Sequence, residues 1–139
     1  MPDPRHQKLS QVLIHYSLAI KPGDKLSISG HAIAAPLIRE VYREAIRAGA
    51  HVTTYIDIEG LREIYYREAS DEQLNYISEL DKLEAEHFNA ELGIWSEMNT
   101  KALSNVDPRR MAERRSARAS LLKRSLERMA AGEVRWCEN

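Results

Sequence analysis

The chain has 139 residues, of which 43% are hydrophobic and 29% are charged, so it can bury one core but is short for two domains. Its formal net charge of -1 gives no overall attraction to nucleic acids or anionic membranes, and a single cysteine, Cys137, excludes an internal disulfide. No apolar run approaches the roughly 18 residues of a membrane span, and the first residues lack the apolar centre of a signal peptide. We therefore expect one cytoplasmic domain over residues 1–139, with no membrane partner.

The first elements predicted along the chain are a helix, a turn and a strand. Apolar residues near the N-terminus recur at helical spacing, and we expect them to share the inner face of a helix: Leu9, Val12, Leu13, Tyr16 and Ile20. The sequence KPGD is typical of a turn that ends this helix. KLSISG, residues 25–30, then has the composition of a first β-strand.

A second helix is predicted between a proline and a glycine. Pro36 is tolerated in a first helical turn, and Gly49 is typical of a helix end. The predicted inner face carries Leu37, Val41 and Ala45. The outer face alternates bases and acids: Arg39, Glu40, Arg43, Glu44 and Arg47. Because opposite charges three or four residues apart are usual on exposed helices, we expect this outer face to form ion pairs in solvent.

Three further segments are predicted to be strands. HVTTYIDI, residues 51–58, is rich in β-branched and aromatic residues, and its spacing from the first strand is that of a right-handed βαβ unit with parallel strands. FNAELGIWS, residues 88–96, is predicted to be the third strand. EVRWCEN begins a fourth, in which Val134 and Trp136 alternate. The sequence thus predicts an α/β fold of three layers, with a parallel sheet flanked by helices.

Helices are predicted between the second and third strands. A short helix after Gly60 contains Leu61, Ile64 and Tyr65. Ser70 and Gln73 then fit a capping box that starts another helix. Its inward residues are predicted to be Leu74, Ile77 and Leu80, with Leu83 continuing the inner face. The acids of ELDKLEAEH are therefore expected on a solvated face, although such a cluster could also suggest acid/base work or a hard cation.

The last predicted helix is strongly basic. Asp107 and Pro108 are typical of its N-cap and first turn, and Gly132 closes it after about Ala131. Its basic residues are Arg109, Arg110, Arg114, Arg115, Arg118, Lys123, Arg124 and Arg128. Its expected inward stripe is Ala112, Ala119, Leu122, Leu126 and Met129. Such a helix could follow phosphates, but without a nucleic-acid-binding motif we expect its arginines to face solvent or to pair with acids of another domain or subunit.

The carboxyl ends of the predicted strands form the candidate ligand site. In open parallel sheets ligands bind beyond these ends, where Gly30 and His31, Asp57 to Gly60, and Ser96 to Thr100 would meet. The turn after the first strand lacks the glycines of a dinucleotide site, which makes a nucleotide ligand improbable. His31 could orient a ligand, but we favour a structural role in which it caps a helix or bonds to a nearby loop.

Metal and nucleophile motifs are lacking. The five histidines are dispersed, and no HExxH or Cys-His cluster brings ligands together. Cys137 lies near the end of the sequence with no basic neighbour that would activate its thiol. We therefore expect no catalytic residue, no metal and no cofactor on this chain.

Five sequence stretches, in order, resemble the N-terminal domain of thermophilic metallo-aminopeptidases of the aminopeptidase T and aminopeptidase S type. They are HYSLAIKPGDKLSISG, AAPLIREVYREAIRAGAHV, EIYYREASDEQLNYIS, NTKALSNVDPRRM and GEVRWC. The resemblance covers about Lys8 to Cys137, and it implies a flavodoxin-like α/β layer that walls the cleft and contributes to a dimer or other homo-oligomer.

The resemblance also implies an activity that this chain alone would lack. The family removes N-terminal amino acids from peptides, with two divalent metals, zinc or cobalt, held in a C-terminal catalytic domain. Those ligands have no counterparts here. We therefore expect a peptide as the substrate of the full-length enzyme and an inactive chain on its own. The alternative is a free-standing α/β module that binds a small molecule in the crevice at the strand ends.

One loop carries the residues that the resemblance places near a substrate cleft. Where relatives tend to show PENTRALSGVDP, this chain has SEMNTKALSNVDP, with Glu97 displaced by one residue. Asn99 and Thr100 match the family pattern, whereas Lys101 and Asn105 depart from it. The candidate substrate-cleft residues are therefore His31, Glu97, Asn99 and Thr100.

Overall fold

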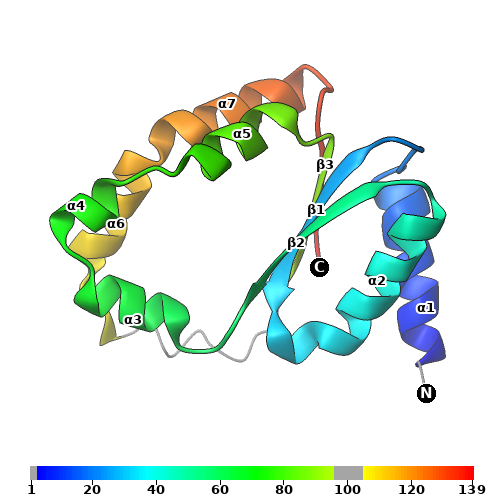
Figure 1. Cartoon of the computed structure of the whole chain (residues 1–139), viewed down its shortest axis with the longest axis horizontal. Coiled ribbons are helices and arrows are strands. Elements are labelled where there is room, and N and C mark those ends of the chain that lie inside the picture. Colours follow the sequence, from blue (N-terminus) through cyan, green and yellow to red (C-terminus); the bar gives the residue numbers. More distant parts are fainter. Residues whose placement is uncertain (1–2, 96–104) are drawn as a thin grey trace.

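A single parallel sheet organises the chain. The computed structural model describes residues 3–95 and 105–139 (Figure 1). Its strands are β1 (Lys25–His31), β2 (His51–Asp57), β3 (Ala90–Ile94) and β4 (Arg135–Glu138). They are parallel and adjacent in the order β2-β1-β3-β4. The predicted α/β fold with a parallel sheet flanked by helices is confirmed.

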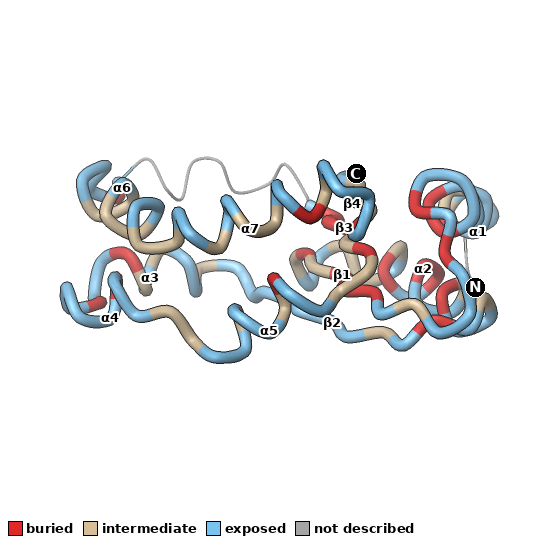
Figure 2. Tube along the Cα trace, turned by 90° about the horizontal axis from the view of Figure 1, so that it is seen from above, coloured by how far each residue is buried: buried red, intermediate tan, exposed pale blue. Residues whose placement is uncertain are grey.

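The main core lies between one face of the sheet and the helices α1 (Pro4–Gln11) and α2 (Ala35–Arg47). Leu26, Ile28 and Leu92 point from the strands into this core. Val41 and Ala45 meet them from α2 and are fully buried, as predicted. Figure 2 shows that buried residues gather in this part of the molecule, whereas the remaining helices are largely exposed.

The first helix differs from the prediction because its second half is a π-helix. After α1 the chain continues as η1 (Val12–Ser17), in which the Leu18 amide donates to the Leu13 carbonyl at 3.0 Å. A bond across five residues widens each turn and changes which side chains face inward. Leu13, Ile14 and Leu18 are buried as a result, while Val12 and Tyr16 are exposed, so their predicted inward position is wrong.

The outer face of α2 is less exposed than predicted. A 3₁₀ turn, η2 (Ala32–Ala34), precedes the helix, and Arg39, Arg43 and Arg47 face solvent as expected. Glu40, however, is only 6% exposed, because it faces α1, and it pairs with Arg43 at 3.6 Å. Its predicted place in solvent is therefore wrong.

Three helices connect β2 to β3: α3 (Leu61–Glu68), α4 (Asp71–Asn75) and α5 (Glu79–His87). The capping box of Ser70 and Gln73 is present and Leu74 is fully buried, which confirms the predicted helix start. The helix does not continue, because Tyr76 is extended and Ser78 caps a new helix at the Asp81 amide. This break turns the following leucines outward, so the predicted inward position of Leu80 and Leu83 is wrong.

The predicted final helix is two helices, α6 (Pro108–Ala117) and α7 (Ala119–Ala130), which meet at Arg118. The Asp107 carboxylate caps the Arg109 amide, and Gly132 has a φ of 75°, so the predicted start and end are confirmed. The predicted inward stripe is wrong: Ala112, Ala119, Leu122 and Leu126 are exposed. None of the described helices has the length and apolar character needed to cross a bilayer.

Arginines of α6 and α7 hold the arm formed by α3 to α7. Arg110 donates to the carbonyls of Tyr66 and Ala69 at the end of α3, and Arg114 donates to those of Leu74 and Tyr76 at the end of α4. Arg128 donates to the carbonyls of Ala85 and Phe88 at the end of α5, at 2.9 and 2.7 Å. Helix C-termini leave carbonyls unpaired and carry partial negative charge, so guanidinium groups stabilise them.

These bonds correct the expectation for part of the helix: several arginines bond within the chain, whereas Arg109 and Arg115 are exposed as expected. Arg118 pairs with Asp81 at 3.2 Å and Arg124 with Glu86 at 2.7 Å, again within the chain. A small second core supports the same arm. It consists of Tyr66, Ala69, Leu74 and Val106, packed against Tyr65 and Met111.

Candidate functional site

The described carboxyl ends of β1, β2 and β3 lie side by side, as expected for parallel strands. His31, the last residue of β1, is paired in register with Asp57, the last residue of β2. Gly30 is paired with Ile94 at the end of β3, and Trp95 follows directly. The region therefore carries an imidazole and a carboxylate on neighbouring strands.

His31 packs against an aromatic ring and occupies the N-cap position of η2 without a side-chain cap. Its ring lies 5.0 Å from that of Trp95 between centroids, at 72°, an edge-to-face contact. Its side chain makes no capping bond to the following η2 helix, so the predicted capping role is wrong. Among the described residues, its buried Nδ1 atom has no hydrogen-bond partner.

Gly30 is required by strand packing. A Cβ atom at this position would lie 2.3 Å from the Ile94 carbonyl oxygen of the adjacent strand. The backbones of β1 and β3 therefore approach too closely at this position for any side chain. This contact explains the need for glycine at position 30 without a ligand.

The loop that the resemblance placed near a substrate lies outside the described residues. Glu97, Asn99 and Thr100 belong to this segment, as does Ser96. Their roles as substrate-cleft residues stay predictions, and of the candidate residues the structure places only His31.

A cavity of about 450 Å³ lies between the arm and the sheet and is lined by charges of both signs. Its walls come from α3, α5, α6, α7 and β3. The acids that line it are Asp81, Glu84 and Glu91, and the bases are Arg62, Arg114, Arg115 and Arg118. We call it the charged cavity. The cavity was not predicted, although Glu91, the second residue of β3 and flanked by buried residues, was a signal in the sequence.

Two carboxylates of the charged cavity have raised pKa values. Burial raises the pKa of Glu84, the charges of Glu91 and Asp81 raise it further, and the Tyr55 hydroxyl and Arg118 partly offset them. Burial also raises the pKa of Glu91, and Arg128 partly offsets it. The Tyr55 pKa is raised in turn, first by burial and then by the Glu84 charge. The ionised forms of both glutamates are therefore short of stabilising partners.

These shifts predict that Glu91→Gln stabilises the chain at neutral pH. A carboxyl whose pKa is raised on folding binds more protons in the folded state, so its contribution to stability falls as pH rises above the ordinary glutamate value of 4.5. The gain in free energy of unfolding should be small near pH 4.5 and should grow toward pH 7. Urea unfolding at several pH values measures it, with exposed Glu68→Gln as the control. A gain that does not change with pH would contradict the prediction.

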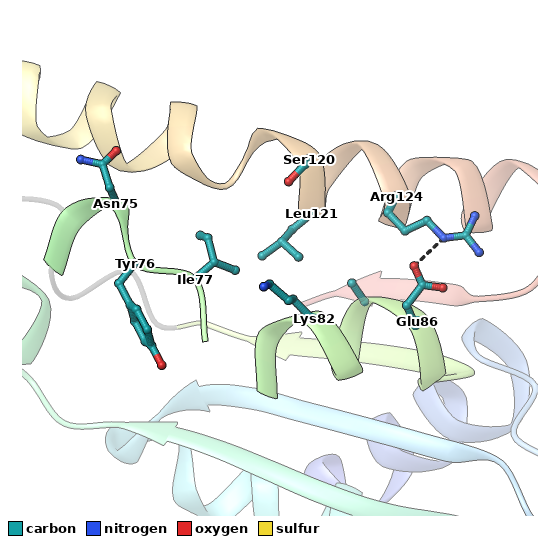
Figure 3. A pocket seen from close by; sticks show the side chains of 9 residues that line it. Asn75, Tyr76, Ile77, Lys82, Glu86, Ser120, Leu121 and Arg124 are labelled. Carbon is teal, nitrogen blue, oxygen red and sulfur yellow. Dashed lines mark hydrogen bonds and ion pairs between the residues drawn. The ribbon is translucent and has the colours of Figure 1, made fainter. Parts of the chain in front are cut away.

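A second hollow, of about 640 Å³, lies between the α4–α5 segment and α7 (Figure 3). Asn75, Tyr76 and Ile77 border one end, and the ion pair of Arg124 and Glu86 crosses the other at 2.7 Å. Lys82 projects from α5 between them. None of the residues predicted to form a site lines this hollow.

Comparison with known proteins identifies the family. Residues 3–139 match the family described as thermophilic metalloprotease (M29). This chain belongs to the M29 family. Its fold resembles that of wild-type AmpT from Thermus thermophilus, with a TM-score of 0.74 and 22% sequence identity over 96% of this chain. The match covers 34% of AmpT, so this M29 chain spans about one third of that protein's length. No curated protein sequence matches it.

The described residues of this M29 chain do not fit the metals that the family name implies. Residues 3–95 and 105–139 contain no group of three His, Cys, Asp or Glu side chains that could hold a metal ion. A two-metal peptidase needs several such ligands converging on one point, to activate water and to stabilise the oxyanion. No catalytic step is therefore assigned to these residues.

Proposed function

We propose that this chain is the N-terminal α/β domain of a metal-dependent aminopeptidase, which removes N-terminal amino acids from peptides. The family match over residues 3–139 carries the proposal, and the likeness to AmpT supports the fold it requires. In this proposal the two divalent metals, zinc or cobalt, are held by a catalytic domain outside the described residues. In the proposal this domain walls the substrate cleft with its strand ends, where His31 lies, and Glu97, Asn99 and Thr100 remain predicted substrate-cleft residues.

We also propose that the enzyme is a cytoplasmic homo-oligomer. Apolar side chains are exposed along the edge strand β2 and just after it. They include Tyr55, Ile56 and Ile58, which are 40%, 42% and 63% exposed. An exposed strand edge with apolar side chains is a surface that another chain or domain commonly covers. This observation supports a contact surface without naming which copy or domain occupies it.

If the metals are held by a separate catalytic domain, this chain alone should be inactive. The purified 139-residue chain, supplied with zinc or cobalt, should neither bind two metal ions stoichiometrically nor release the amine from leucine p-nitroanilide. Elemental analysis and the absorbance of nitroaniline measure both. Two tightly bound ions together with metal-dependent cleavage would show that the active site lies on this chain.

A chimera tests the aminopeptidase activity itself. The chain would replace the matching third of AmpT, and the product should cleave leucine p-nitroanilide when metal is added, whereas the chain alone should not. A chimera that folds and binds metal but cleaves no N-terminal residue would contradict the proposed function.

A further inference from the structure

The sheet has an unusually polar second face. Parallel strands are normally covered on both faces and are apolar throughout. Here the register places Thr53, Ser27, Glu91 and Trp136 in one row across the four strands, on the face opposite the main core. Ser27 is only 1% exposed, so this polar row is not simply a solvent surface. Its Glu91 lines the charged cavity.

Some charges of the cavity are already neutralised within the chain. Asp81 pairs with Arg118, and Arg114 donates to the carbonyls at the end of α4. Glu84 and Glu91 differ: among the described residues, neither forms an ion pair with a base. The two carboxylates thus lie side by side on α5 and β3 without an ion-pair partner, and the Tyr55 hydroxyl and the more distant Arg118 and Arg128 offset their charge only in part.

The opposite sign is also unmatched in the same cavity. Arg115 on α6 and Arg62 on α3 line it, and in the described part of the chain neither forms an ion pair with an acid. Arg62 instead lies over the Tyr66 ring, 6.0 Å from its centroid. Two guanidinium groups therefore share the cavity with two carboxylates without pairing to them.

We propose that the charged cavity binds a small zwitterion, an amino acid or a dipeptide. Its ammonium group would lie against Glu84 and Glu91, and its carboxylate against Arg115 or Arg62. Each charge of such a ligand would meet a group of opposite sign that has no ion-pair partner among the described residues, whereas a simple cation or a simple anion would pair only with the carboxylates or only with the arginines. The volume of about 450 Å³ lies within the range of small-molecule sites. The inference rests on the cavity and does not depend on the proposed function.

Calorimetric titration with three matched probes tests the proposal. The probes are leucylglycine, its N-acetyl derivative, which lacks the ammonium group, and its amide, which lacks the carboxylate. We expect leucylglycine to bind the metal-free chain about tenfold to hundredfold more tightly than either derivative, since bonds between charged groups contribute about 1.5–3 kcal/mol each.

Single variants test the contributions of the carboxylates and the arginines to binding separately. Glu91→Gln should weaken leucylglycine binding about tenfold or more, and because the same change is expected to stabilise the fold, the loss cannot be due to unfolding. Arg115→Gln should reduce the preference of the wild-type chain for leucylglycine over its amide. Glu68→Gln and Arg109→Gln, exposed and outside the cavity, should change neither.

Three results would overturn the proposal: no binding of leucylglycine at millimolar concentration, equal binding of all three probes, or unchanged binding by Glu91→Gln. None of them bears on the aminopeptidase proposal, because the titration contains no metal and measures no cleavage. Conversely, an inactive chimera would leave the zwitterion site intact.

Discussion

Gly30→Ala is expected to destabilise the chain by an amount near the upper end of the range of about 1–3 kcal/mol found for overpacked sites. The added Cβ atom would lie 2.3 Å from the carbonyl oxygen of Ile94 and 3.2 Å from its carbonyl carbon. Both atoms belong to the backbone of the adjacent strand, so relief requires β1 and β3 to move apart in the middle of the sheet. Urea unfolding monitored by circular dichroism measures the loss.

Gly93→Ala is the matched control. Its Cβ atom would meet the Trp95 indole nitrogen at 2.6 Å, and this neighbour is a side chain that is 41% exposed and can rotate away. The expected loss is therefore smaller, about 1 kcal/mol. Equal losses for the two variants would mean that the contact between β1 and β3 does not decide the need for glycine at position 30.

The positions of the strands along the chain, and their parallel direction, could be predicted because their signals are local. β-Branched runs, the capping box at Ser70 and the N-cap at Asp107 each depend on a few neighbouring residues, and all are present. The parallel direction then follows from the handedness of the βαβ connection. The strand ends, with His31 beside Asp57, could be placed for the same reason.

The inward faces of the helices could not be predicted with the same success. The inward residues were predicted from a regular period of 3.6 residues per turn. That period does not apply to the π-helix at Val12–Ser17, and it is interrupted at Tyr76 and Arg118, where helices end. Each interruption rotates the residues that follow, which left Leu80, Leu122 and Leu126 exposed. These errors come from backbone geometry that sequence period alone does not contain.

The charged cavity could not be predicted because its walls are far apart in sequence. Arg62, Glu91 and Arg115 come from three separate elements and meet only when the arm folds back toward the sheet. In the sequence, the basic residues of α6 and α7 resemble a single charged surface. The structure divides them into those that bond to helix ends, such as Arg128, and those left unpaired in the cavity, such as Arg115.

Arg128→Met is expected to cost about 2–4 kcal/mol, because methionine keeps the apolar bulk but removes every donor. Arg128 is 5% exposed and bonds the carbonyls of Ala85 and Phe88 at 2.9 and 2.7 Å, so both acceptors would lose this partner. Arg124→Met on the same helix is the control: its pair with Glu86 is exposed to solvent, so its loss should reduce stability much less than the loss of Arg128. Urea unfolding compares the two variants.

In Arg128→Met, hydrogen exchange should also show faster opening of α5 and α7 than of the sheet, since this arginine joins the two helices. Equal stability losses, or uniform exchange, would mean that the arm is held mainly by its small apolar core.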